Sequence, residues 1–199
     1  MTRQFHSPLT PGASFFEQVD SAPDPLLARE AADRAAVVLV RGARRSDDPE
    51  VAGRILRLAD GEEGIEAIAE LWSSSPADSL AGCLWRLFAL RSWVYADPAG
   101  AAREFDAGRS RTPVARVVAG VAEPPGPDEL KAMVDEVLRG IATSDFADVL
   151  LRAAAFARVV AFGRAALHPE QTGSGVDALL RVSEQLEAAG HAELEQPLG

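Results

Sequence analysis

Prolines in this chain stand where helices begin. In five places a proline directly follows a residue whose side chain can cap a helix. These pairs are Asp24-Pro25, Asp48-Pro49, Ser75-Pro76, Asp97-Pro98 and Thr112-Pro113. Proline is tolerated at the first helical position because the N–H that it lacks would have no partner there. An oxygen of the preceding side chain accepts a hydrogen bond from a free N–H of the first turn. The pattern therefore predicts a chain divided into helices.

The sequence lacks alternating strand-like segments joined by hairpin turns. Asp60-Gly61 is a hairpin dipeptide, but it follows apolar residues at helical spacing and so indicates the end of a helix. We therefore predict an all-α fold of about eight helices. The predicted helical ranges are 25–44, 49–60, 62–73, 76–96, 98–107, 128–139, 144–167 and 174–189, and a further short segment lies at 113–122. The valines within 113–122 would also suit a strand, so helix and strand both stay open there.

Two of these segments have no polar face. Residues 80–95 and 146–167 are apolar nearly all round, and the second is rich in alanine. A helix of this kind is usually buried by neighbours on several sides. We therefore predict a compact multi-helix bundle, in which the amphipathic helices pack around these two central ones.

A proline-rich break divides the chain. Residues 123–127 read Glu-Pro-Pro-Gly-Pro, which predicts a rigid break after a helical core at 13–122. Residues 128–190 are then expected to form C-terminal helices that pack on the same core. Residues 1–12 and 191–199 lack periodicity, and we expect them to be mobile tails.

Charge and cysteine content restrict the class of protein. The formal net charge of the 199 residues is -10, and an acidic domain repels both phosphate backbones and anionic membranes. The single cysteine, Cys83, cannot form a disulfide within the chain. The first residues carry no apolar run of signal-peptide length, and residues 146–167 contain four charged side chains that disfavour a membrane span. We expect a cytoplasmic protein that binds neither nucleic acid nor membrane directly.

Motifs of catalysis and cofactor binding are missing from the sequence. The three histidines have no metal-ligand spacing, and no GxSxG, Walker A or CxxC string occurs. Residues 173–178 form a GxGxxA string, but a predicted helix precedes them where a dinucleotide site requires a strand. We interpret Cys83 as a small core residue. We therefore predict no metal, no cofactor and no catalytic residue, although carboxylates and arginines assembled by folding leave an enzyme as a third hypothesis.

An acidic stripe is the first candidate site. Glu62, Glu66 and Glu70 stand four residues apart, which places them on one helical face, with Glu63 beside them. Like charges at this spacing repel one another by roughly 0.2–0.5 kcal/mol per pair. The stripe could be a docking surface for a basic partner or part of a divalent-metal site. The simpler interpretation is a solvated face that is paired with arginines.

A group of tryptophans and arginines is the second candidate site. Trp85, Trp93 and Arg86 lie in the first central helix, and Arg152 lies in the second. A buried arginine needs a partner, so a small acidic ligand could be held between the helices, with the tryptophans as walls. The alternative is internal ion pairing, with the charged ends of the side chains reaching the surface.

One part of the sequence carries a resemblance. The stretch 63–72, followed by Ser-Pro-Ala-Asp-Ser-Leu at 75–80 and Leu-Trp-Arg-Leu at 84–87, resembles an uncharacterised helical protein family of actinobacteria. The resemblance covers about a quarter of the chain. It implies a cytoplasmic bacterial protein and assigns no activity or catalytic residue.

Two hypotheses about function follow. The first is a non-catalytic interaction or regulatory module that binds a protein partner through the acidic stripe, and that could form a homodimer through an alanine-rich helix face. The second is a sensor or binding domain for a small anionic ligand, with a pocket between the central helices. A ligand-induced change in tryptophan fluorescence would favour the second hypothesis.

Overall fold

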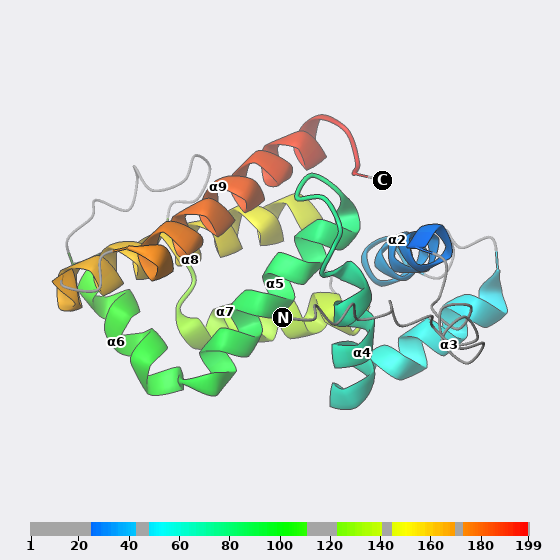
Figure 1. Ribbon diagram of the computed structural model, residues 1–199, viewed down its shortest axis with the longest axis horizontal. Helices are drawn as coiled ribbons and strands as arrows, with labels where there is room; N and C mark the ends of the chain where they lie inside the picture. Colours follow the sequence, from blue (N-terminus) through cyan, green and yellow to red (C-terminus); the bar gives the residue numbers. More distant parts are fainter. Residues whose placement is uncertain (1–24, 43–47, 111–122, 141–144, 170–172, 199) are drawn as a thin grey trace, which may run out of the picture.

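The computed structural model describes residues 25–42, 48–110, 123–140, 145–169 and 173–198 (Figure 1). Within these ranges the chain forms eight helices and no strand, which confirms the predicted all-α fold. The helices are α2 (Pro25–Arg41), α3 (Pro49–Ala59), α4 (Glu62–Trp72), α5 (Leu80–Ala96), α6 (Pro98–Arg109), α7 (Pro127–Leu138), α8 (Phe146–Leu167) and α9 (Ser174–Glu195). None of these described helices is both long and apolar enough to cross a membrane.

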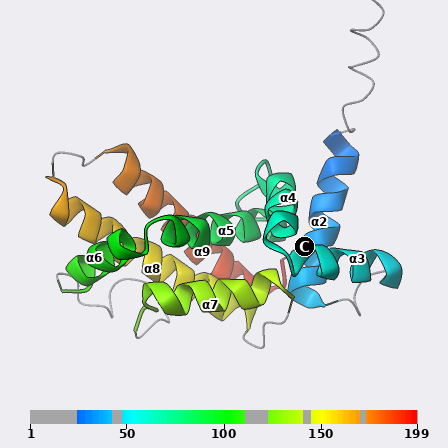
Figure 2. The same cartoon turned by 90° about the horizontal axis from the view of Figure 1, so that it is seen from below.

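The helices pack in two groups along the molecule. Helices α8 and α9 run antiparallel and side by side over most of their length, and α6 packs on α8 at one end (Figure 1). Helices α2, α3 and α4 gather at the opposite end, and the first turn of α2 points away from the body (Figure 2). Helix α5 connects the two groups because it contacts members of both.

The two predicted central helices form the middle of the core. Leu84 and Leu87 of α5 and Leu150 and Phe156 of α8 have no exposed surface. The alanines of α8 at 153–155 are also buried. Since this alanine-rich face is used inside the chain, a homodimer would need a different surface.

Two glycines bring α6 and α8 into close contact. A Cβ atom on Gly163 would lie 1.7 Å from the carbonyl oxygen of Glu104, and one on Gly108 would lie 1.9 Å from that of Val159. No real side chain tolerates such distances, so only glycine allows the backbones to approach this closely. The contact fixes one end of α8 against α6.

Local capping signals explain several helix starts. Asp48 accepts hydrogen bonds from two backbone N–H groups of α3, and Asp97 accepts one from the N–H of Gly100 at 2.8 Å, as predicted for both aspartate–proline pairs. The prediction at Ser75-Pro76 is wrong, because α5 begins at Leu80 with Ser79 as its cap. The pairs at 24–25 and 112–113 include residues outside the described ones, as does the whole of 113–122.

The turn before α5 explains the displaced helix start. Residues 76–79 form a turn in which both the N–H and the hydroxyl of Ser79 donate to the carbonyl oxygen of Pro76. This turn lies directly against the first turn of α5, since a Cβ atom on Gly82 would be 1.7 Å from the same oxygen. The chain therefore folds back over the helix instead of starting it at Pro76.

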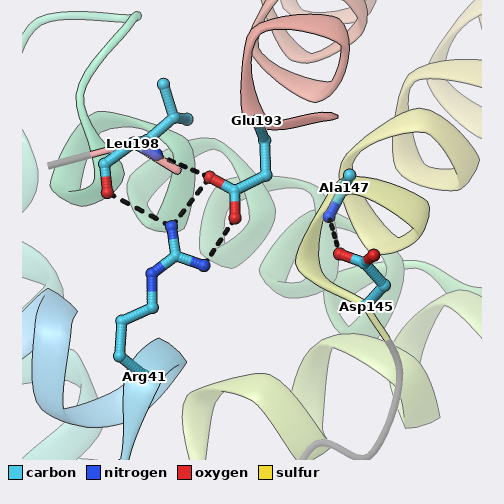
Figure 3. A network of polar contacts seen from close by, with 5 residues as sticks. All are labelled: Arg41, Asp145, Ala147, Glu193 and Leu198. Carbon is cyan, nitrogen blue, oxygen red and sulfur yellow. Dashed lines mark hydrogen bonds and ion pairs between the residues drawn. The ribbon is translucent and has the colours of Figure 1, made fainter. Parts of the chain in front are cut away.

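The end of the chain differs from the prediction. Helix α9 continues to Glu195, so residues 191–195 belong to a helix and not to a mobile tail. Glu193 is only 8% exposed and pairs with Arg41 of α2, and its carboxylate accepts the N–H of Leu198 at 2.7 Å (Figure 3). This buried contact between distant parts of the sequence holds the last helical turn. The predicted tail at 1–12 lies outside the described residues.

Candidate functional site

Helix α4 presents the predicted acidic stripe to solvent. Glu63, Glu66 and Glu70 are exposed, whereas Ile65, Ile68 and Trp72 on the other face are buried. The indole N–H of Trp72 donates to the carbonyl oxygen of Ala32 in α2 at 3.1 Å. The buried face therefore fixes the rotation of α4 and turns its carboxylates outward. Glu62 begins the helix, but its side chain is outside the described set.

No described cation lies within ion-pair distance of the acidic stripe. None of the ion pairs found among the described residues involves Glu63, Glu66 or Glu70. On the neighbouring helix α3, by contrast, Glu50 pairs with Arg54 one turn later at 3.2 Å. The described part of the chain thus gives no support to the interpretation in which arginines neutralise the stripe.

An exposed leucine flanks the acidic stripe near the C-terminal end of α4. Leu71 is 41% exposed and directly follows Glu70, so its side chain points about 100° around the helix from that of Glu70. Leu71 also lines an open groove of about 350 Å³ between the end of α4 and the start of α2, where Ala28 and Arg29 form the other side. We call Glu63, Glu66, Glu70 and Leu71 the α4 surface.

The four residues of the predicted Trp–Arg pocket do not come together. Arg86 and Trp93 line one open groove between α5 and α9, but Trp85 lies outside it and stacks on Phe88 with ring centroids 6.0 Å apart. Arg152 lines a different opening, beside Pro124 and Glu129. The predicted composition of the pocket is therefore wrong. The reason is the register of α8, which places Arg164 at the groove, about 18 Å further along the helix than Arg152.

The groove between α5 and α9 is lined by apolar side chains and by two arginines, Arg86 and Arg164. Its volume is about 240 Å³. Its apolar lining residues are Ala89, Leu90, Trp93, Ala178, Leu179 and Val182. We call this site the α5–α9 groove.

The two arginines of the α5–α9 groove differ in their partners. Arg164 pairs with Glu104 at 3.0 Å, and its guanidinium lies over the Trp93 ring at 5.1 Å from the centroid. Arg86 donates from Nε to Oε1 of Gln185 and from Nη1 to the carbonyl oxygen of Gly82, both at 2.7 Å. Both of these acceptors are neutral. Burial lowers the pKa of the Arg86 guanidinium from its usual value.

The single thiol is placed for packing. Cys83 is fully buried in α5, as predicted, and its sulfur lies 3.5 Å from the carbonyl oxygen of Ala77. Burial raises the pKa of this thiol to about 12. A neutral, buried thiol is a poor nucleophile and a poor metal ligand.

Comparisons with known proteins do not assign the chain to a family. No family model matches it, and no curated protein or solved structure is significantly similar to it. The resemblance to an actinobacterial helical family stays a prediction. Across the described ranges, no group of three or more His, Cys, Asp or Glu side chains is arranged to hold a metal ion. The geometry of the α4 surface and of the α5–α9 groove therefore carries the functional argument.

Proposed function

We propose that this protein is a non-catalytic interaction or regulatory module, and that it binds a basic segment of a partner protein through the α4 surface. The proposal rests on the exposure of Glu66 and Glu70 and on their lack of an ion-pair partner among the described residues. Both side chains are exposed on a helix that is fixed by Trp72, and no described cation lies within ion-pair distance of either. Repulsion along the stripe costs stability, and a cationic partner would relieve it.

The chemistry of the α4 surface specifies the kind of partner. Carboxylates one turn apart match lysines or arginines at the same spacing on a partner helix, and Leu71 offers an apolar contact beside them. The net charge of -10 would speed the approach of a basic partner. It also disfavours a second copy of this chain at the same surface, since two acidic stripes would face each other.

We also propose a cytoplasmic location. Cys83 is a free, buried thiol, and the described part of the chain holds no disulfide. This thiol usage fits a reducing compartment.

Charge reversal tests the proposal. The chain with E66K and E70K, and a matched control with E136K and E184K, would be immobilised and exposed to lysate. Glu136 and Glu184 are exposed glutamates on α7 and α9, so both variants change the net charge equally. We expect partners of the unmodified chain to be lost from the E66K/E70K variant and kept by the control. Capture of the same proteins by all three chains would contradict the proposal.

A further inference from the structure

One arginine stands apart from the other buried and half-buried arginines that the structure describes. Every other member of this set has a carboxylate within 4.0 Å. These pairs are Arg41–Glu193, Arg91–Asp135, Arg152–Asp148, Arg158–Glu187 and Arg164–Glu104. Arg86 contacts only the neutral oxygens of Gln185 and Gly82, and its Nη2 group donates to neither. Asp78 lies near enough to attract the Arg86 guanidinium but not within ion-pair distance of it, so an anion in direct contact would complete this site.

The surroundings of Arg86 define what kind of anion would fit. The Arg86 side chain lines the α5–α9 groove, and Trp93 lies two turns further along the same face of α5. Arg86 and Trp93 are therefore about 10 Å apart along the helix axis. Apolar side chains of α9, including Leu179 and Val182, form the opposite wall. A ligand in the groove would have one charged end and an apolar body.

Charge balance favours a monoanion. Arg164 is already paired with Glu104, which leaves Arg86 as the one cation lining the groove without an ion-pair partner. A carboxylate can accept a hydrogen bond from the Nη2 group that has no acceptor, whereas a phosphate dianion would need further donors. The groove volume of about 240 Å³ offers room for a short hydrocarbon chain.

We infer that the α5–α9 groove binds a small amphipathic monocarboxylate, with the carboxylate on Arg86 and the hydrocarbon chain along Trp93 and Val182. This inference is independent of the partner proposed for the α4 surface. Ligand binding here would link α5 to α9, since both helices line the groove.

The test uses octanoate and its neutral counterpart octanol as probes. Binding to the full chain would be followed by calorimetry and by tryptophan fluorescence, to which Trp93 contributes together with Trp72 and Trp85. We expect saturable octanoate binding in the millimolar range or tighter, and weaker octanol binding by about tenfold or more, because only the carboxylate gains charge-assisted hydrogen bonds. Equal affinity for both probes, or no saturation by octanoate up to about 10 mM, would overturn the inference.

Variants test whether the carboxylate of octanoate binds to Arg86. R86Q removes the charge, R86K restores it, and R181Q removes the charge of an exposed arginine elsewhere on α9. We expect R86Q to weaken octanoate binding about tenfold or more, R86K to recover part of it, and R181Q to leave it unchanged. A second variant, A178F, fills the groove from an exposed position and leaves Arg86 in place. It is expected to abolish binding, and unchanged octanoate affinity in A178F or R86Q would refute the site.

Discussion

Arg41 and Glu193 stand 152 positions apart in the sequence, yet they form two parallel hydrogen bonds that join α2 to the end of α9 (Figure 3). The distances are 2.5 Å from Nη1 to Oε1 and 2.7 Å from Nη2 to Oε2. The backbone of Leu198 adds a donor to Glu193 and an acceptor for Arg41. This contact ties the first described helix to the last one.

Breaking the Arg41–Glu193 pair is expected to destabilise the fold strongly. R41M leaves the buried Glu193 charge without its partner, which costs about 3–5 kcal/mol in comparable sites. The double variant R41M/E193Q should lose less stability than R41M alone, because it buries no unpaired charge. Urea denaturation measures the free energy of unfolding.

The control R54M breaks the exposed Arg54–Glu50 pair and should change stability by about 0.5 kcal/mol or less. Equal losses in R41M and R54M would argue against the structural role of the Arg41–Glu193 pair.

The only tyrosine of the chain reports on its contact with Asp135. The Tyr95 hydroxyl donates to Oδ2 of Asp135 at 2.7 Å, and this hydrogen bond, together with burial, raises the pKa of Tyr95 above its ordinary value of 10.0. Absorbance at the tyrosinate band should therefore titrate above pH 10, and Y95F should abolish the signal. A titration at or below the ordinary pKa would show that the hydrogen bond is absent.

The same shift predicts how Tyr95 contributes to stability. A group whose pKa is raised in the folded state stabilises the fold fully at pH values below its unfolded pKa. This stabilisation is lost as the pH rises through its folded pKa. The free energy of unfolding should therefore fall above about pH 10 more steeply in the unmodified chain than in Y95F. Parallel pH profiles of the two proteins would contradict this.

Glycine at position 163 is expected to be indispensable for the α6–α8 contact. G163A places a methyl group 1.7 Å from a backbone oxygen, so the two helices must separate, at a cost of about 1–3 kcal/mol or more. G53A is the matched control, because a Cβ atom there meets only the flexible end of Arg57 at 3.4 Å. It should stabilise α3 by about 0.5–1 kcal/mol. Thermal melting distinguishes the two variants, and a neutral G163A would contradict the close packing.

Cys83 is expected to be inert while the protein is folded. Its pKa of about 12 leaves almost no thiolate at pH 8, and its side chain is fully buried. A thiol-reactive chromogenic disulfide should therefore label the native protein only slowly and the urea-unfolded protein rapidly. Fast labelling of the native protein would show that α5 opens or that the thiol is accessible.

Features encoded by local chemistry could be predicted from the sequence. Asp48 and Asp97 cap helices through neighbouring N–H groups, so the aspartate–proline pairs were sufficient to locate both starts. The cap at Ser79 was missed because it depends on how the turn at Pro76 packs against Gly82. The end of α9 was missed for a similar reason, since its last turn is held by Arg41 from the other end of the chain.

The same difference between local and long-range structure applies to the candidate sites. Residues within one helix kept the relationship that helical spacing predicts, as Arg86 and Trp93 do on α5 and Glu66 and Glu70 do on α4. Arg152 was misplaced because its position relative to α5 depends on how far α8 slides along its neighbours. The sequence gives no signal for that register. It also does not show that Arg86, among the buried and half-buried arginines that the structure describes, is the one without a carboxylate in ion-pair contact.

The α4 surface is tested most directly by the dissociation constant of a purified partner obtained by capture. This constant would be measured for the unmodified chain, for E66Q/E70Q and for the control E136Q/E184Q, at low and at high salt. We predict that E66Q/E70Q weakens binding by about tenfold or more, that added salt weakens binding to the unmodified chain, and that the control behaves like the unmodified chain. Equal dissociation constants for all three proteins would show that binding does not use the α4 surface.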